Sequence, residues 1–454
     1  MRRMLIALCV VMFCFNVAAV GEPHVIIITI DGFAAYNMKD KNAPIPTLRK
    51  LAEEGAVAEG MKVCNPSVTW PNHTTLISGV RPDKHGVLFN GILMRPGVGV
   101  PVSVDSKRDG SELVGVQTLP DILHKAGMRC GEINWPCTRN SPAYEDNFAD
   151  VPEQVKWMTP KLREELVAMG ELPDATDKSW GPLSAARKDQ IWAAAACRVI
   201  RARKPNLLLL HLLLTDGLQH KYGPQTPGAF AAVGMADAHV RDVLRALDEA
   251  GIRQETTLFI VADHGFASAS KLVCPNVLFR KEGLLKSALL KIGSARVEAV
   301  SEGGTAFVYF TDPQTMSEDK AKVRAMLKDA EGIEEIIEPD RYGEFHYPLP
   351  ERNRQMAEMV LAAKPDYAFS NKATGEEFMI APTLNQDNFG HHGYLNSYAK
   401  MNAVFIAVGR GIAKGTKVGM VENVDVAPTA AFLLGQEIPG AEGKVMKEIL
   451  SEGK

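Results

Sequence analysis

The sequence predicts an α/β fold in which helices cover both faces of a mostly parallel central sheet. Four segments are continuously apolar instead of alternating, which is typical of strands buried on both faces. Helical patterns separate these segments along the chain, as the crossover connections of a parallel sheet require. The four expected strands are HVIIITI from His24, NLLLLHLLL from Asn206, TTLFIVA from Thr256 and AVFIAVG from Ala403.

Three helical units are expected around these strands. Residues 184–203 form an apolar helical pattern that ends before Pro205, and residues 235–252 form another that ends near Gly251. Both ends carry the residues that commonly stop helices. Residues 118–136 predict a helix, a turn at Gly127 and then a further strand.

The domain organisation follows from a change of character after Phe266. Shorter strand patterns, an amphipathic helix and a polar stretch replace the long apolar runs up to about Pro382. We therefore expect residues 21–265 and 383–454 to form the main domain and residues 266–382 an inserted α+β cap. The composition, with 46% hydrophobic and 23% charged residues in a chain of 454, is that of a globular protein and sets aside disordered and fibrous classes.

Residues 1–20 have the layout of a secretory signal peptide. Arg2 and Arg3 precede an apolar run, and small residues follow before the expected cleavage near Ala19 or Val20. The alternative is a membrane anchor, but the apolar run is shorter than the roughly 20 residues a spanning helix needs. We expect a periplasmic or secreted protein with no stable membrane span after cleavage.

Charge and cysteine content exclude some classes of partner and leave others open. The net charge is −3 and no basic tract stands out, so the sequence predicts no nucleic-acid binding surface. Five cysteines follow residue 20, and Cys130 and Cys137 are close enough in sequence to bridge locally. The oligomeric state is not predicted.

Three aspartates follow three of the expected strands. Asp31 comes after the first, Asp216 after the second and Asp263 after the third. Ligands in open α/β sheets bind at the carboxyl ends of the strands, so these side chains are expected at one edge. Carboxylates crowded in a poorly hydrated cleft repel one another unless cations neutralise them. The pattern therefore predicts a metal site.

Histidines near the aspartates complete a donor set of oxygen and nitrogen. His220 lies four residues after Asp216, His264 follows Asp263, and His391 and His392 precede the last strand. This set suits zinc best, and manganese, iron and magnesium less well. We expect two divalent metal ions, one held by Asp31, Asp263 and His264 and the other by Asp216, His220 and His392.

Thr69 lies in the segment SVTWPNHTTLISG, residues 67–79, at the start of an expected helix. One interpretation is that its hydroxyl is a helix N-cap or a turn acceptor and has no role in chemistry. A threonine hydroxyl is a poor nucleophile unless a base or metal removes its proton, and a metal held with Asp31 could do so. A second metal would stabilise the departing oxygen of a displacement at phosphorus. Thr69 is therefore the predicted nucleophile.

Several segments together resemble a known family. They are SVTWPNHTTLISGVRPDKHGVLFNG, TIDG, TDGLQHKYGP, ADHG and HHGY. In this order they resemble the nucleotide pyrophosphatase/phosphodiesterase branch of the alkaline phosphatase superfamily. The resemblance covers most of the chain after residue 20 and is thin in the expected cap. It implies an alkaline phosphatase-like three-layer α/β/α sandwich that hydrolyses phosphoric diesters, of nucleotide or lipid head-group type, through a phosphothreonine intermediate.

The resemblance also implies roles for single residues. Thr69 would be the nucleophile and a ligand of the zinc held by Asp31, Asp263 and His264. Asn90 would hold a phosphoryl oxygen, and His392 is preferred to His391 because the glycine of the H-G pair follows it.

Trp70 and His211 are the expected substrate-binding residues. Trp70 matches a position where the family often has an aromatic residue that faces the substrate. His211 stands five residues before Asp216, where nucleotide-cleaving members resemble one another in having an aromatic residue against the base. The histidine at this position weakens the nucleotide interpretation and leaves the leaving group open.

Alternatives remain at this point. A phosphomonoesterase or a phosphonoacetate hydrolase would use the same metals on a small-molecule substrate with a different substituent on phosphorus. A non-enzymatic alternative is an exported metal-binding protein without turnover. All seven candidate metal-site residues are chemically competent, which favours an enzyme.

Overall fold

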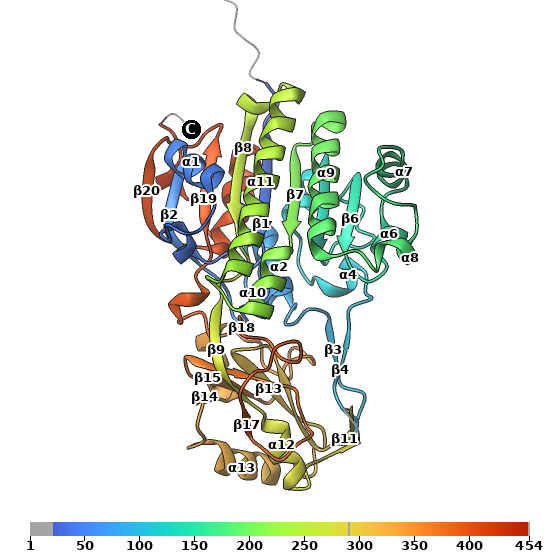
Figure 1. Cartoon of the computed structure of the whole chain (residues 1–454), viewed down its shortest axis with the longest axis vertical. Helices are drawn as coiled ribbons and strands as arrows, with labels where there is room; N and C mark the ends of the chain where they lie inside the picture. The colour runs from blue at the N-terminus through green and yellow to red at the C-terminus, as the bar shows by residue number, and fades with distance from the viewer. Residues whose placement is uncertain (1–20, 289–290, 453–454) are drawn as a thin grey trace, which may run out of the picture.

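The structure is a computed structural model that describes residues 21–288 and 291–452. Figure 1 shows a large sheet with its helices in the upper part of the molecule and a group of smaller sheets below it. The expected signal peptide, residues 1–20, lies outside the described residues.

The large sheet has eight strands and is mostly parallel, as predicted. The fourth expected strand is the exception, because β19 pairs antiparallel with both of its neighbours. A strand buried on both faces is continuously apolar in either direction, so its pattern did not reveal its orientation. The strands, in spatial order, are β20 (Thr416–Glu422), β2 (Ala56–Lys62), β19 (Phe405–Gly409), β8 (Thr256–Val261), β1 (His24–Ile30), β7 (Leu207–Leu212), β5 (Cys130–Pro136) and β6 (Asp146–Asp150).

Helices cover the two faces of this sheet. Long helices α9 (Ala185–Arg203) and α11 (Pro227–Ala250) pack side by side, as Figure 1 shows, and α1 (Pro46–Glu54) contacts α11. A second group packs together and contains α2 (Thr69–Ser78), α5 (Leu119–Lys125) and α14 (Val426–Leu433).

The predicted helices are present, with one boundary displaced. Helix α9 matches residues 184–203 closely, and α5 ends before a turn in which Gly127 has a φ of +74°. Helix α11 begins eight residues before the expected start, since the side chain of Thr226 caps it and Pro227 occupies its first turn. A cap and a proline thus set its start, ahead of the apolar pattern.

Below the large sheet lie smaller sheets built mainly from the segment between β8 and β19. Strands β12 (Val297–Ser301), β13 (Thr305–Phe310), β15 (Met359–Ala363) and β14 (Ile333–Ile337) form one antiparallel sheet. Strand β9 (Ala267–Val273) pairs with β16 (Asp366–Phe369), β17 (Met379–Ile380) and β18 (Gly390–His391). The boundaries expected for the cap, 266 and 382, stay a prediction.

Shorter elements complete the chain. The hairpin β3 (Ile92–Met94) and β4 (Ser103–Asp105) runs down beside the smaller sheets in Figure 1, and Arg95 in it forms an ion pair with Glu358. The others are α3 (Pro82–His85), α4 (Gly110–Leu113), α6 (Gln154–Trp157), α7 (Pro160–Ala168), α8 (Asp177–Trp180), α10 (Leu214–Tyr222), α12 (Pro275–Lys281), α13 (Met316–Leu327), β10 (Leu285–Ala288) and β11 (Lys291–Ala295).

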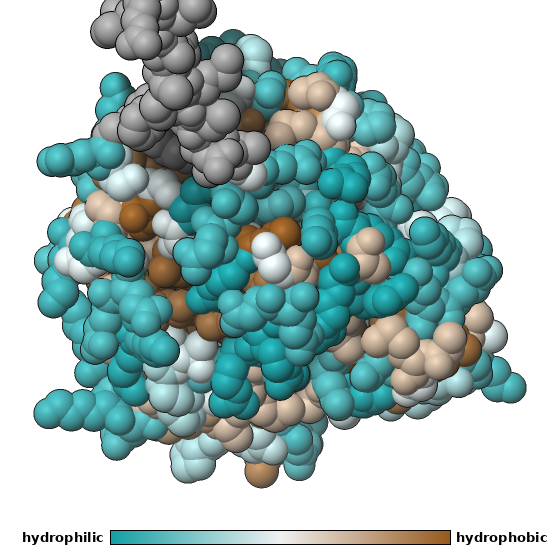
Figure 2. Space-filling view, turned by 90° about the horizontal axis from the view of Figure 1, so that it is seen from above, coloured by the Kyte–Doolittle hydropathy of each residue, from teal (hydrophilic) through white to brown (hydrophobic). Residues whose placement is uncertain are grey.

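Figure 2 shows the upper end of the molecule, which is mostly hydrophilic with apolar side chains in small separate groups wherever the grey atoms leave it visible. Cys130 and Cys137 do not bridge, and the five described cysteines are all free and buried. Within residues 21–288 and 291–452, no helix combines the length and apolar character needed to cross a membrane.

Candidate active site

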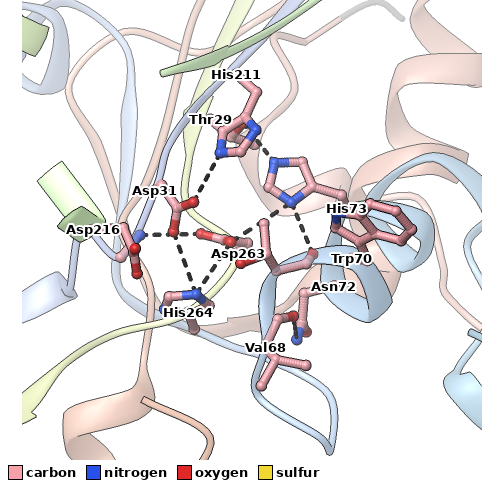
Figure 3. Close-up of polar contacts among 12 residues, drawn as sticks. Thr29, Asp31, Val68, Trp70, Asn72, His73, His211, Asp216, Asp263 and His264 are labelled. Atoms are coloured by element: carbon pink, nitrogen blue, oxygen red, sulfur yellow. Dashed lines mark hydrogen bonds and ion pairs between the residues drawn. The ribbon is translucent and has the colours of Figure 1, made fainter. Parts of the chain in front are cut away.

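The three aspartates lie together at the carboxyl edge of the large sheet. Asp31 directly follows β1, Asp216 lies in the first turn of α10 after β7, and Asp263 comes two residues after the end of β8. Figure 3 shows the carboxylates of Asp31 and Asp263 converging on the ring of His264. Because β1, β7 and β8 are parallel neighbours, the sheet brings together residues from three distant segments.

Three histidines use one ring nitrogen to fix their orientation. Nδ1 of His220 donates to the carbonyl oxygen of Gly390 at 2.8 Å, and Nδ1 of His392 donates to that of Ser67 at 3.1 Å. In His264, Nδ1 contacts the carbonyl oxygen of Gly265 at 3.1 Å. A ring that donates through Nδ1 and is neutral presents the lone pair of Nε2, which is the form that binds metal ions.

These Nε2 atoms face carboxylate oxygens, so lone pairs oppose lone pairs. Nε2 of His264 lies 3.3 Å from Oδ1 of Asp31 and 3.3 Å from Oδ2 of Asp263. Nε2 of His220 and of His392 lie 3.3 Å and 3.6 Å from Oδ1 of Asp216. Among the described residues, four of these atoms are buried without a hydrogen-bond partner: Oδ1 of Asp31, Oδ1 of Asp216, Oδ2 of Asp263 and Nε2 of His264.

Divalent cations fit this arrangement, because one ion satisfies several unpartnered acceptors at once. Within the described part of the chain, two sets of ligand atoms lie within 4.8 Å of one another. One contains Asp216, His220 and His392, as expected. The other contains Asp31, His264 and again Asp216, so this carboxylate lies between the two groups, while Asp263 reaches the second through His264.

Burial and neighbouring charge perturb the protonation of these groups. Burial raises the pKa of Asp31 well above its ordinary value, and the charges of Asp263 and Asp216 raise it further. Burial lowers the pKa of His392 well below its ordinary value, and His264 and His220 add to this effect. The ring of His392 is therefore neutral and able to act as a ligand at physiological pH.

Thr69 is the first residue of α2, a helix whose ten residues are all buried. Val68 is the N-cap, so Thr69 does not serve as the helix cap. The helix ends at Gly79, which adopts a left-handed conformation with a φ of +70°. This placement leaves the Thr69 hydroxyl at the helix N-terminus, where the backbone N–H of Thr69 and the helix dipole favour a bound anion.

Asn90 lies beside the start of α2. Its Oδ1 accepts a hydrogen bond from the backbone N–H of Trp70 at 2.9 Å, which orients the amide and leaves Nδ2 as a donor. Asn90 also lines a pocket of about 610 Å³ together with His220 and His392. The structure thus places Asn90 beside two histidines of the candidate metal site.

Trp70 and His211 do not line that pocket, and the expectation that they contact substrate stays a prediction. The indole of Trp70 is buried and its Nε1 donates to Asp150 at 3.1 Å. His211 is fully buried in β7, where Nδ1 contacts the carbonyl oxygen of Asn134 at 3.1 Å and Nε2 contacts Oδ2 of Asp31 at 3.0 Å. His211 therefore contacts the carboxylate of Asp31 from the neighbouring strand β7, as Figure 3 shows.

His73 has a place in the site that the sequence analysis did not assign. Its Nδ1 donates to the carbonyl oxygen of Thr69 at 2.9 Å and lies 3.6 Å from Oδ2 of Asp263, while Nε2 contacts the hydroxyl of Thr29 at 2.8 Å. The ring thereby links the helix start to the carboxylates. The spacing of four residues from Thr69 to His73, one turn of helix, was the available signal.

The pocket extends from His220 and His392 to the smaller sheets. Phe89 and Asn90 form one side, and Glu302 lies on the side contributed by the smaller sheets. Ser301, Gly303, residues 369–374 and residues 386–388 complete much of the wall. The pocket therefore has room for a small ligand beside the candidate metal-binding residues.

The family described as Type I phosphodiesterase / nucleotide pyrophosphatase matches residues 25–395. Ectonucleotide pyrophosphatase/phosphodiesterase family member 3 of Rattus norvegicus is 21% identical over 408 residues, which is 89% of this chain and 41% of that protein. Family member 1 of Homo sapiens is also 21% identical, over 90% of this chain and 40% of that protein. The chain thus spans about two fifths of the length of these relatives.

Other relatives extend the comparison. Venom phosphodiesterase 2 of Crotalus adamanteus is 22% identical over 90% of this chain and 45% of that protein. Among solved structures, murine ectonucleotide pyrophosphatase/phosphodiesterase 5, in an inactive form in complex with AMP, has a TM-score of 0.71 at 17% identity. The match covers 95% of this chain and all of that one, which confirms the alkaline phosphatase-like fold.

Proposed function

The chain belongs to the Type I phosphodiesterase / nucleotide pyrophosphatase family, a family of hydrolases that act on phosphoric ester bonds, and on this basis we propose that it is an exported two-metal phosphodiesterase. The substrate is a small-molecule phosphoric diester, and the reaction proceeds through a phosphothreonine on Thr69. The observation that carries the proposal is the convergence of unpartnered carboxylate and imidazole atoms beside the start of α2.

Two divalent cations, most suitably zinc, fit the site. Asp31, Asp263, His264 and Thr69 would hold one, and Asp216, His220 and His392 the other. When bound, such cations lower the pKa of a coordinated hydroxyl and neutralise charge on a departing oxygen. The backbone carbonyls of Ser67, Gly265 and Gly390 keep the histidine rings in the tautomer that this binding requires.

The residues of the chain act in two displacements. Oγ1 of Thr69 gives up its proton to solvent and attacks phosphorus, the P–O bond to one alcohol breaks, and the departing oxygen takes a proton from solvent to leave as the alcohol. Water then attacks the phosphothreonine, releases the phosphoric monoester and restores the Thr69 hydroxyl. In both steps Nδ2 of Asn90 and the backbone N–H of Thr69 donate to the phosphoryl oxygens, which carry more charge in the transition state.

A steady-state comparison of bis(p-nitrophenyl) phosphate with p-nitrophenyl phosphate, on zinc-loaded protein, tests the proposal. We expect a higher kcat/KM for the diester, loss of turnover in Thr69→Ala, and retention of measurable turnover in Thr69→Ser, which keeps a hydroxyl. A preference for the monoester would identify a phosphatase instead. Wild-type turnover in Thr69→Ala would remove the phosphothreonine from the mechanism, and no turnover in any form would favour a metal-binding protein.

Export is part of the same proposal. Residues 1–20 carry the signal-peptide pattern, and one of the relatives is named a venom phosphodiesterase. Expression of the full chain in a bacterial host should release a product that begins near residue 20 or 21 into the periplasm or medium, as N-terminal sequencing would show. A cytoplasmic product that retains Arg2 and Arg3 would contradict export.

A further inference from the structure

Gln219 is a buried side chain on α10 that connects the two groups of candidate metal ligands. It lies directly before His220, three residues after Asp216, and is 1% exposed. Its Nε2 donates to the carbonyl oxygen of Gly32 at 2.9 Å. Gly32 follows Asp31, which belongs to the ligand group that His220 does not join. One hydrogen bond therefore joins the helix of one group to the loop of the other.

The backbone of Gly32 extends this connection to a further ligand. Its N–H donates to Oδ1 of Asp263 at 3.1 Å, and Oδ2 of Asp263 lies 3.3 Å from Nε2 of His264. Both backbone groups of Gly32 are thus engaged, one with Asp263 and one with Gln219. Hydrogen bonds that orient metal ligands typically change metal affinity by about 10- to 100-fold when they are removed.

Phe266 packs against histidines of both groups. Its ring centroid lies 4.9 Å from that of His220, 5.5 Å from that of His392 and 5.9 Å from that of His264. The side chain is fully buried. Gly32 leaves room for it, since a Cβ at Gly32 would lie 2.7 Å from the ring and the φ there is +66°. Phe266 therefore restricts the orientation of three ligand rings at once.

The segment before His392 is held against the same helix. The N–H of Phe389 donates to the carbonyl oxygen of His220 at 2.8 Å. A Cβ at Gly390 would overlap the carbonyl oxygen of Gln219, so only glycine allows this close approach. Helix α10 is thus fixed both to the loop that follows β1 and to the segment that carries His392.

These contacts make the order of one ligand group depend on the order of the other. We propose that Gln219 and Phe266 are positioning residues that couple the two groups, so that a metal ion bound in one favours binding in the other. An ion in either group restricts α10 and the loop after β1 together, so the second ion meets ligands that are already ordered. This inference rests on the two-metal site of the proposed function and concerns how that site is filled.

Native mass spectrometry tests the coupling without turnover. The full protein is stripped with a chelator and titrated with zinc, and chains with no, one and two ions are counted. When one ion is bound per chain on average, independent sites leave roughly half of the chains or more with a single ion, whereas a tenfold coupling leaves about a quarter. We expect about a quarter in the wild type. A wild-type fraction of half or more would overturn the proposal.

Two substitutions test the residues themselves. Gln219→Met has a similar volume but lacks the amide, and Phe266→Leu stays apolar but lacks the ring. Each should raise the single-ion fraction to about half or more, because the connection between the groups is lost. Thermal melting shows whether each variant is folded. An unchanged fraction in either folded variant would overturn the proposal.

Thr215→Val is the matched control. Thr215 lies on the same helix directly before Asp216 and is also 1% exposed, but its Oγ1 has no hydrogen-bond partner among the described residues. This variant should fill with zinc in the same way as the wild type. If it raises the single-ion fraction as much as Gln219→Met does, Gln219 has no specific role and the proposal falls.

Diester hydrolysis separates this inference from the proposed function. Turnover of bis(p-nitrophenyl) phosphate is followed through the same zinc titration. In the wild type it should rise from the first addition of zinc, and in Gln219→Met it should lag, because chains with a single ion form first. Concerted filling without any hydrolysis would end the phosphodiesterase proposal and leave the coupling in place. Hydrolysis in a wild type that fills one ion at a time would do the reverse.

Discussion

The imidazole rings of His264 and His392 stack with their centroids 3.7 Å apart and an interplanar angle of 14°. One ring follows β8 and the other follows β18, so the stack joins the two halves of the candidate metal site. Two charged rings at this distance would repel each other, and burial together with His264 lowers the pKa of His392. The ring of His392 in this stack is therefore neutral, and its Nε2 is available as a ligand.

Replacement of His392 should remove one of the two metal ions. In His392→Asn, the group formed with Asp216 and His220 loses a ligand, and we expect zinc content to fall from about two ions per chain to about one. The control is His391→Asn, because Nε2 of His391 faces the carbonyl oxygen of Asn388 and His391 is in neither ligand group. Mass-spectrometric metal analysis of zinc-loaded, dialysed protein measures the difference. Loss of zinc in the control alone would reverse the assignment.

Two substitutions of Asn90 distinguish a role as hydrogen-bond donor to the substrate from a structural role. Oδ1 accepts from the N–H of Trp70, so Asn90→Asp preserves this contact, replaces the Nδ2 donor with an acceptor oxygen and adds a negative charge. We expect both Asn90→Asp and Asn90→Ala to lower kcat for the diester by about 10²- to 10³-fold, since a transition-state donor is lost. Near-normal kcat in Asn90→Asp would show that the contact to Trp70 is the important one.

The conformation of the loop before Thr69 should depend on the hydrogen bonds of Asn72. Its fully buried amide accepts from the N–H of Cys64 at 2.8 Å and from Asn423 at 2.8 Å, and it donates to the carbonyl oxygens of Pro66 and Val68 at 3.0 and 2.9 Å. Asn72→Ala leaves several buried groups unpaired, so the free energy of unfolding should fall by about 2 to 4 kcal/mol.

Thr74→Val provides the comparison for Asn72. It removes one bond within the same helix, from the Thr74 hydroxyl to the carbonyl oxygen of Trp70, and should cost about 1 kcal/mol. Urea unfolding of both variants measures the two losses. Equal losses would show that Asn72 contributes no more than an ordinary helix hydrogen bond.

Sequence patterns predicted the parts of this molecule that repeat along the chain. Continuous apolar runs gave β1, β7 and β8, and their parallel order brought Asp31, Asp216 and Asp263 to one edge. Direction was not encoded in such a run, so the antiparallel β19 could not be distinguished.

Local sequence patterns could not predict side-chain contacts between distant segments. A histidine five residues before Asp216 has the same sequence signature whether it faces the substrate or lies under Asp31, and only packing places His211 in the second position. The same holds for Glu302 in the pocket wall, since a single glutamate near a turn has no pattern until β12, β13 and the segment around His392 come together.

Asp189 should make stability depend on pH. It lies on α9, is 1% exposed, and accepts from the N–H groups of Leu213 and Leu214 at 2.9 and 3.1 Å, where α10 begins. Burial raises its pKa to about 7, against a value of about 3.9 for an aspartate in an unfolded chain. Between about pH 4 and pH 7 the folded protein therefore keeps a proton that the unfolded chain releases. Ionisation of Asp189 therefore lowers the free energy of unfolding as pH rises through that window.

The asparagine in Asp189→Asn cannot titrate, so the decline in the free energy of unfolding that Asp189 causes should disappear. Urea unfolding at pH 4.5, 6.0 and 7.5 should show the variant gaining stability relative to the wild type as pH rises. Asp248→Asn, at an exposed position of α11, controls for the change in net charge. Its free energy of unfolding should change with pH in the same way as that of the wild type. Parallel curves for Asp189→Asn as well would mean that the carboxylate is ionised in the folded protein. The two backbone N–H groups at the start of α10 would then outweigh burial, and the helix that carries Asp216 and His220 would be anchored by a charge.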